Sequence, residues 1–279
     1  MIKYIIILAL LPNIVFSQES KDWVDLFNGK DLSGWDIKFT GYDLNDNLNK
    51  TFGVKDGLLS VSYDEWSDFN NEFGHIFYNK PYSHYRLKVI YRFVGDQVTN
   101  GPGWAYRNNG VMLHSQSAAS MLKDQDFPIS LETQLLGGNG KDERPTGNLC
   151  TPGTHVNIDG KLVEEHCIIS TSKTYHGDQW VEMEILVLGD SLIQHVIDNK
   201  VVFTYSKPVI GGGVVANYDD KIKKDGKALT EGYISLQAES HPTQFRSIRL
   251  LNLKGCRNKD AANYKDYFVA DDPKACVFY

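Results

Sequence analysis

The chain has 279 residues, 42% of them hydrophobic, with 29 basic and 35 acidic side chains and a formal net charge of -6. This slightly acidic balance, without a dense run of lysine or arginine, argues against a nucleic-acid partner or an anionic membrane surface and favours a neutral ligand. The length is enough for one large all-β domain or two small ones, and we expect one large core.

The N-terminus has the order of a cleavable signal peptide over residues 1–17. Lys3 precedes seven aliphatic residues and a proline, and small side chains at Val15 and Ser17 suit cleavage before residue 18. The apolar run is shorter than the roughly 20 residues that span a bilayer, and no later stretch could anchor the chain in a membrane. We therefore expect a secreted or periplasmic protein. The alternative, a buried N-terminal strand, fits the lone lysine poorly.

Residues 84–94 form the clearest predicted strand, because large apolar side chains at the odd positions alternate with polar ones at 84, 86, 88 and 92. An alternation with period two is typical of a half-buried strand. Shorter runs of the same kind lie at residues 58–63, 111–114, 129–136, 180–188, 192–197, 201–205, 233–239 and 245–253.

Turn residues separate many of these runs and predict antiparallel hairpins at Gly189-Asp190, Asp198-Asn199 and Asp159-Gly160. Residues 207–231 contain three consecutive glycines and predict a long surface loop or lid, because phosphate-loop spacing is missing. No amphipathic helix longer than two turns is evident, which disfavours α/β folds. The sequence therefore predicts an all-β protein, a two-sheet antiparallel sandwich or jelly roll.

Four cysteines fall into two local groups, Cys150 with Cys167 and Cys256 with Cys276. Export would place them where disulfides persist. Pairing within each group is the simplest of the three connectivities that four cysteines allow, and each such loop would stabilise the fold by roughly 3 kcal/mol. A zinc site would need closer ligand pairs than this spacing offers.

Six segments stand out by their order and spacing. They are DLFNGKDLSGW at 25–35, VKDGLL at 54–59, NGVML at 109–113, LETQLL at 131–136, GYISLQ at 232–237 and FRSI at 245–248. With these segments the chain resembles the 3-keto-disaccharide hydrolase family from Asp25 to about Lys254. The resemblance implies a concanavalin A-like jelly roll whose concave face holds the sugar. It also implies an activity on glycosides that are already oxidised at C3.

The resemblance divides the chain into a jelly-roll domain at residues 18–254 and a C-terminal segment at 255–279. This segment is bounded by Cys256 and Cys276 and resembles a short module of secreted Bacteroidetes proteins, so we expect a disulfide-closed unit. One departure from the family pattern concerns a candidate site residue, because His114 stands where many members carry arginine.

Glu132 and Gln134 are two residues apart in a predicted strand, so both side chains point to one face. Gln237 and Glu239 repeat this arrangement on another strand, and we expect the two pairs to face one cleft. The competing interpretation is that Glu132 is a solvated residue on a half-exposed sheet. Retaining sandwich glucanases use Glu-x-Asp-x-x-Glu, and the Gln134 and Gly137 of this chain make that double displacement improbable.

A ketone at C3 acidifies the hydrogen on C2, so one base could abstract it, the enolate would expel the C1 substituent, and water would add to the enone. We assign Glu132 as this base or as a metal ligand, with His114 as a second catalytic group. The expected substrate-binding residues are Gln134, Asn109, Gln237, Glu239, His241, Arg246, Trp104 and Tyr106. The alternative for Arg246 is a buried ion pair with a core carboxylate, and the alternative for Trp104 and Tyr106 is core packing. A divalent metal stays open as a cofactor, because the histidines show no His-x-x-x-His spacing.

The expected partner is an oligosaccharide or glycoside, cleaved by hydrolysis or elimination. Two alternatives stay open. A non-catalytic carbohydrate-binding module would need only aromatic platforms and amides, and an adhesion protein could be displayed through the C-terminal cysteine unit.

Overall fold

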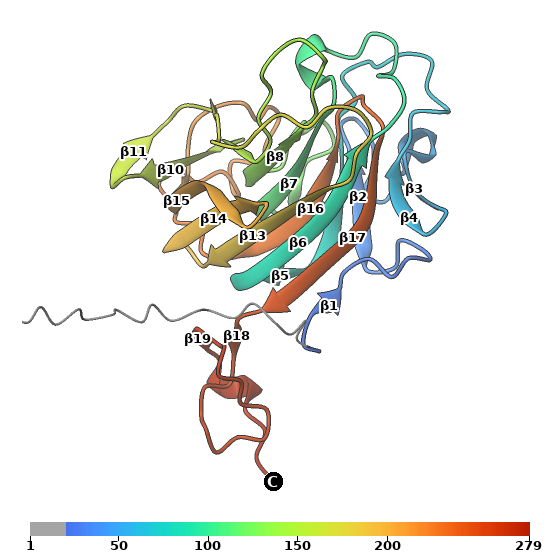
Figure 1. Cartoon of the computed structure of the whole chain (residues 1–279). Coiled ribbons are helices and arrows are strands. Elements are labelled where there is room, and N and C mark those ends of the chain that lie inside the picture. Colours follow the sequence, from blue (N-terminus) through green and yellow to red (C-terminus); the bar gives the residue numbers. More distant parts are fainter. Residues whose placement is uncertain (1–20) are drawn as a thin grey trace, which may run out of the picture.

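The computed structural model describes residues 21–279, and the predicted signal peptide lies outside the described residues. Two antiparallel β-sheets pack face to face (Figure 1). Helical segments among residues 21–279 are short 3-10 turns, and none of them could cross a membrane. The predicted all-β, two-sheet antiparallel sandwich is confirmed.

The larger sheet has ten strands. They are β1 (Val24–Asp25), β3 (Phe52–Lys55), β4 (Leu58–Val61), β6 (His84–Phe93), β10 (Thr154–Ile158), β11 (Lys161–Val163), β13 (Val181–Leu188), β14 (Leu192–Ile197), β15 (Lys200–Ile210) and β17 (Thr243–Asn252). Their order is β11-β10-β15-β14-β13-β6-β17-β4-β3, and β1 pairs with β17.

The second sheet has seven strands. They are β2 (Trp35–Phe39), β5 (Gly74–Tyr82), β7 (Asn108–Ser115), β8 (Leu131–Leu136), β9 (Asn148–Cys150), β12 (Cys167–Ile168) and β16 (Gly232–Ala238). Their order is β12-β9-β8-β7-β16-β5-β2. We call the side of this sheet that faces away from the ten-stranded sheet the pocket face.

Most predicted strands are present, and the local sequence explains their bounds. In β6 the odd positions are buried and the even positions are half-buried, as the alternation predicts. The β14–β15 hairpin turns at Asp198 and Asn199, whose φ values of 50° and 59° suit these residue types. Six strands of the sandwich were not predicted, because they are short or lack a period-two pattern: β1, β2, β3, β5, β9 and β12.

The core lies between the two sheets and is formed by the inward side chains of both. A polar bridge crosses it, because the Thr133 hydroxyl on β8 lies 2.8 Å from His195 Nε2 on β14. Within the seven-stranded sheet, the Asn109 side chain on β7 donates to the Gln237 carbonyl oxygen on neighbouring β16 at 2.6 Å. Both bonds satisfy groups that would be costly if they were buried without a partner.

The chain after β17 stands apart from the sandwich (Figure 1). It contains the short parallel pair of β18 (Lys254–Gly255) and β19 (Ala270–Asp271) and the Cys256–Cys276 disulfide. The other disulfide joins Cys150 on β9 to Cys167 on β12. Both pairs have the local connectivity that the sequence favours.

Candidate active site

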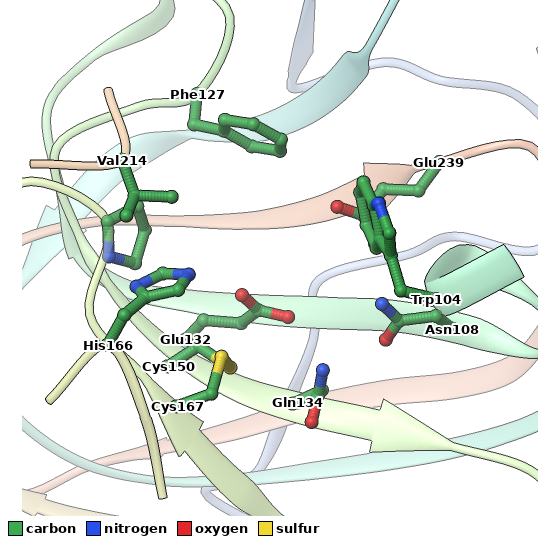
Figure 2. Close-up of a pocket in the computed structure, with 11 residues that line it drawn as sticks. Trp104, Asn108, Phe127, Glu132, Gln134, Cys150, His166, Cys167, Val214 and Glu239 are labelled. Carbon is green, nitrogen blue, oxygen red and sulfur yellow. A yellow bond between two sulfur atoms is a disulfide. The ribbon is translucent and has the colours of Figure 1, made fainter. Parts of the chain in front are cut away.

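A pocket of about 330 Å³ opens on the pocket face of the seven-stranded sheet (Figure 2). This volume is at the small end of the roughly 300–1,000 Å³ typical of ligand sites. Its lining residues come from β7, β8, β9 and β12, from the chain just after β16, and from loops above the sheet. They are Trp104, Asn108, Phe127, Glu132, Gln134, Cys150, Pro152, His166, Cys167, Val214 and Glu239.

Strand β8 supplies the central carboxyl group of this pocket. Leu131 and Leu135 are buried in the core and Thr133 bonds across it, so the alternation turns Glu132 and Gln134 to the pocket face. Glu132 is only 7% exposed. The sequence prediction that these two side chains share one face is confirmed by the strand geometry.

Gly110 makes room for the Glu132 carboxyl group. On β7, Met112 lies opposite Glu132 and Gly110 lies opposite Gln134. A Cβ atom at Gly110 would stand 2.5 Å from Glu132 Oε1, so the Glu132 side chain occupies the space that a side chain would take. The carboxyl group thereby extends across β7 towards β16, where Glu239 follows the strand.

Glu132 and Glu239 are both buried carboxyl groups of the same pocket. Burial raises the pKa of Glu132 to about 8. Burial, followed by the neighbouring Glu132 carboxyl group, raises the pKa of Glu239 well above its ordinary value. Two carboxyl groups so placed resist simultaneous ionisation, and their different surroundings separate an acid from a base.

Several polar atoms of this region have no protein partner. The Gln237 amide donates to Glu239 Oε1 at 2.7 Å, which leaves Glu239 Oε2 and Gln237 Oε1 buried and unpartnered. Asn108 Oδ1 is in the same state. Gln134 Oε1 instead accepts from the Asn148 amide at 2.8 Å, so the Gln134 amide nitrogen is turned into the pocket (Figure 2). Unpartnered groups beside a pocket are ready to bind polar ligand atoms.

Trp104 forms an aromatic wall of the pocket and is 55% exposed. It stacks on Phe73 with ring centroids 6.0 Å apart and 22° between the planes. Phe73 in turn contacts Phe69, and Phe69 contacts Trp66. This chain of rings holds the wall in place from behind.

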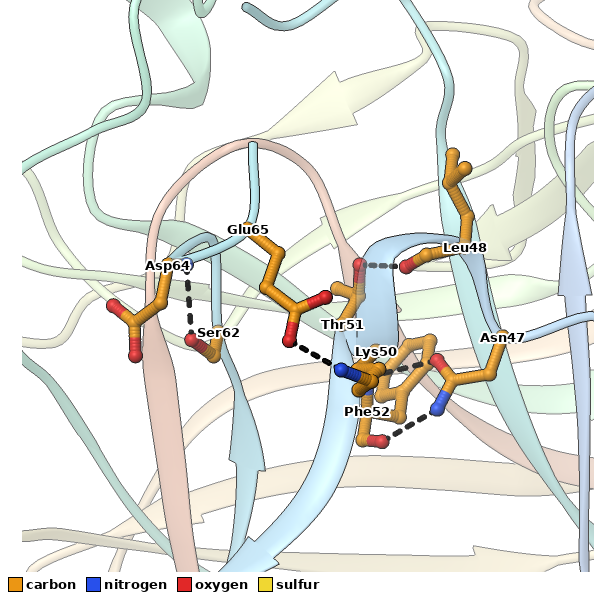
Figure 3. Close-up of polar contacts among 8 residues, drawn as sticks. All are labelled: Asn47, Leu48, Lys50, Thr51, Phe52, Ser62, Asp64 and Glu65. Atoms are coloured by element: carbon orange, nitrogen blue, oxygen red, sulfur yellow. Dashed lines mark hydrogen bonds and ion pairs between the residues drawn. The ribbon is translucent and has the colours of Figure 1, made fainter. Parts of the chain in front are cut away.

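The aromatic chain ends at a polar turn between β2 and β3 (Figure 3). The Trp66 indole donates to the Thr51 hydroxyl at 2.9 Å, and that hydroxyl donates to the Leu48 carbonyl oxygen at 2.6 Å. Asn47 binds both main-chain groups of Phe52. The turn therefore fixes the far end of the ring chain that supports Trp104.

The Cys150–Cys167 disulfide forms part of the wall opposite the β7 side, and His166 lies beside it. Within residues 21–279, these three residues are the one group of histidine, cysteine or acidic side chains close enough to hold a metal ion. Both sulfur atoms are bonded to each other, so they are not available as thiolate ligands. Oxygen donors for a cation would have to come from Glu132 and Glu239.

Of the residues proposed from the sequence, Glu132, Gln134, Glu239 and Trp104 line this pocket, and Gln237 supports Glu239. His114 does not reach it. The backbone turns at His114, with φ of 46°, and its ring donates to the Gly189 carbonyl oxygen of the β13–β14 hairpin at 2.9 Å. Burial lowers the pKa of His114, which keeps the ring neutral.

The other four proposed residues lie elsewhere. Asn109 points into the core. The Tyr106 and His241 rings contact each other with centroids 5.0 Å apart, and neither residue lines the pocket. The His241 ring also contacts Phe93. Arg246 is exposed on β17, where its guanidinium lies 4.9 Å from the Trp180 ring centroid.

Sequence reasoning did not select four of the lining residues, Asn108, Phe127, Pro152 and Val214. Asn108 was overlooked because the start of β7 was placed too late, at residue 111. With the strand begun at Asn108, alternation with buried Val111 and Leu113 places Asn108 and Gly110 on the pocket face. The others are on loops, where sequence carries no periodic signal.

Two antiparallel sheets packed face to face, with a pocket on the outer face of one of them, make this chain a β-sandwich domain of the lectin-like kind. The model of the 3-keto-alpha-glucoside-1,2-lyase-like domain family matches residues 22–251, and the chain belongs to this family. Among curated proteins, none matches the sequence.

Solved structures with a related outline are distant in sequence. Two Parabacteroides distasonis proteins, both provisionally described as glycosyl hydrolases, are 17% identical with TM-scores of 0.48 and 0.49. Their alignments cover 82% and 83% of this chain and 98% and 94% of theirs. A Bacillus subtilis protein with a galectin-like fold is 11% identical over 79% of this chain and 90% of its own, with a TM-score of 0.46. These likenesses are too remote to bear on function.

Proposed function

We propose that this protein is an extracytoplasmic enzyme that cleaves 3-keto glycosides by elimination across C1 and C2, followed by addition of water. The observation that carries the proposal is the buried pair of Glu132 and Glu239 in one pocket. The pKa of the Glu132 carboxyl group, about 8, suits a general base, because a base works best when its pKa lies near the pH of the reaction. Family membership supplies the class of substrate.

In the first step the ionised Glu132 takes the proton from C2, which the C3 ketone has made acidic. The electron pair enters the enolate and then expels the C1 oxygen. Glu239 keeps its proton because burial and the neighbouring Glu132 carboxylate raise its pKa well above the ordinary value, and Oε2 donates that proton to the leaving oxygen. The step converts one glycoside into an enone and an alcohol, leaving Glu132 protonated and Glu239 ionised.

Addition of water reverses these roles. Glu239 takes a proton from the water as its oxygen bonds to C1, and Glu132 returns its proton to C2. Net hydrolysis results and the pair recovers its starting state. The Gln134 amide nitrogen and the Asn108 side chain are placed to bind sugar or enolate oxygens, as electrostatic stabilisation of the developing charge requires.

Product analysis by mass spectrometry tests the proposal. The protein is incubated with matched native and 3-oxidised disaccharides in heavy water. We expect cleavage of the oxidised substrates alone, with deuterium at C2 of the released keto sugar only to the extent that the Glu132 proton exchanges with solvent, and a lower kcat/KM for substrate that carries deuterium at C2. The same kcat/KM for substrate with hydrogen and with deuterium at C2 would contradict the C2 proton transfer, and no release from any 3-keto glycoside would contradict the enzyme assignment.

A carbohydrate-binding module is the second candidate, which the exposed Trp104 ring favours. Binding alone needs no ionisable base. Saturable binding of sugars without any product, and with the same affinity before and after replacement of Glu132 by glutamine, would support the module instead.

A further inference from the structure

Val214 has an uncommon backbone conformation at the mouth of the pocket. It lies in the loop of residues 211–231 between β15 and β16, and its φ is 63°. A β-branched side chain in the left-handed region is a genuine outlier, because the branched carbon crowds the backbone. Such strain persists only where the surroundings impose it, and it concentrates at functional sites.

The neighbours of Val214 impose this conformation. Before it, the Gly213 carbonyl oxygen accepts from the Gly153 amide at 3.0 Å. After it, Val215 is buried against Ile129. The chain is thus tied on both sides, and the loop is held in place at this point.

The Val214 side chain contributes little to the core. It is 51% exposed, and it lines the pocket. Glycine or asparagine would fit the same φ with less strain. The isopropyl group is therefore best explained by contact with a ligand.

The two ends of the pocket lie on either side of Glu132 and differ in polarity (Figure 2). Gln134 and Asn108 lie at the polar end together with the Trp104 ring, which suits a sugar because the amides can bind hydroxyl groups and the ring can stack on the sugar. Val214 lies at the more apolar end beside His166, with Phe127 above it. Because the polar end suits the keto sugar, the apolar end is left for the leaving group.

We propose that Val214 is a specificity-determining residue that caps an apolar leaving-group subsite. The preferred substrate is then a 3-keto glycoside whose leaving group presents an apolar ring, such as a benzyl or aryl alcohol, in place of a second sugar. The inference rests on the proposed function, since only cleavage at C1 gives the two ends of the pocket different roles.

The test compares the benzyl and methyl glycosides of one 3-keto glucose, whose leaving alcohols have similar acidity. Burial of the phenyl ring should raise kcat/KM for the benzyl substrate about 10- to 100-fold over the methyl substrate. Val214→Gly should reduce this ratio at least about fivefold while Tm stays level or rises, because glycine relieves the strain. A ratio near one in the wild type, or an unchanged ratio in the variant, would overturn the proposal.

Val201→Gly is the matched control. Val201 is 50% exposed on β15, away from the pocket and with an ordinary backbone conformation. Glycine there should lower Tm, since it weakens a strand, and leave the benzyl-to-methyl ratio unchanged. The opposite signs of the two Tm changes separate a functional valine from a structural one. A clear fall of Tm in Val214→Gly with an unchanged ratio would make Val214 structural.

A binding measurement keeps the two proposals distinguishable. Calorimetric titration with unoxidised benzyl and methyl glucosides requires no turnover. Tighter binding of the benzyl compound, lost in Val214→Gly, would support the subsite even if every 3-keto glycoside were inert and the proposed function failed. Equal affinities would refute the subsite, while cleavage of the methyl 3-keto glucoside would still uphold the proposed function.

Discussion

The seven-stranded sheet carries buried polar side chains on both faces, and the two sets differ in how they are partnered. On the core face, Thr133 and Asn109 bond across to the other sheet or to a neighbouring strand. On the pocket face, Glu239 Oε2 and Asn108 Oδ1 are buried with no partner. Because an unpartnered buried group is costly, the second set is explained by a ligand and the first by stability.

Glu132→Gln should produce the largest loss of activity among changes on the pocket face. Loss of a general base lowers kcat about 10²- to 10⁴-fold. Stability should rise above pH 5, because the native protein no longer has to protonate a buried carboxyl group, with Tm increasing by about 2–4 °C for each kcal/mol recovered. Steady-state kinetics on a 3-keto disaccharide and thermal unfolding measure both effects.

Glu182→Gln is the control. Glu182 lies on β13 of the other sheet, where its Oε1 forms a long ion pair with Lys88 Nζ at 3.8 Å. The substitution should change neither kcat nor stability appreciably. If Glu132→Gln lost stability and kept its activity, Glu132 would belong with the structural set of the core face.

The pH dependence should divide activity from stability. Activity needs the Glu132 carboxylate, so kcat/KM should rise about tenfold per pH unit below about pH 8 and level off near it. From the ordinary value of 4.5 up to about 8, native Glu132 holds a proton that the unfolded chain has released. Stability should therefore fall through the same window as pH rises.

Chemical denaturation at several pH values, alongside the kinetic profile, checks these opposite slopes. The Glu132→Gln variant should lose the part of the downward slope that Glu132 contributes and keep the part that comes from Glu239, whose pKa burial also raises. A kcat/KM profile that is flat from pH 5 to 8 would remove Glu132 as the base.

Gly110→Ala should disturb the pocket face while sparing the core face. The new methyl group would meet Glu132 Oε1 at 2.5 Å, so the carboxyl group must move. A displacement of about 1 Å at a catalytic group costs up to 10²-fold, and we expect a 10- to 100-fold loss of kcat with a small change in Tm. Gly53→Ala on β3, where nothing lies within 4 Å, should leave kcat unchanged.

Thr133→Val should have the smallest effect on activity and should act on the core face alone. His195 Nδ1 donates to the Gly147 carbonyl oxygen, so Nε2 accepts the Thr133 proton. Valine removes that donor and should cost about 1–3 kcal/mol of unfolding free energy, with kcat within about threefold of the wild type. A large loss of kcat at unchanged stability would show that the two faces are coupled through β8.

Alternation alone was enough to place the central part of the site. Glu132 and Gln134 share a face because a strand has period two, and the same argument holds for Gln237 and Glu239. The family resemblance added the expectation that a concave face holds the sugar, without saying which strands form that face. Strand order and sheet identity depend on contacts between distant segments, which local sequence does not reveal.

The remaining site residues could not be placed from alternation, because their positions depend on local backbone irregularities, on sheet membership or on loops. Alternation along β7 would place His114 on the pocket face, but its left-handed backbone turns the ring to the β13–β14 hairpin. Arg246 alternates with buried Phe245 and is exposed, but β17 belongs to the ten-stranded sheet and not to the sheet that carries the pocket. Val214 and His166 reach the pocket from loops, where position depends on tertiary contacts.

The Cys150–Cys167 disulfide has a consequence for how the protein is produced and handled. Cys150 lies directly opposite Glu132, and the bond joins its strand to the outermost strand of the sheet. Protein made in a reducing compartment would keep its sandwich but lose the covalent link that holds the sheet edge beside the carboxyl pair. Thiol content should therefore be measured before any preparation is judged inactive.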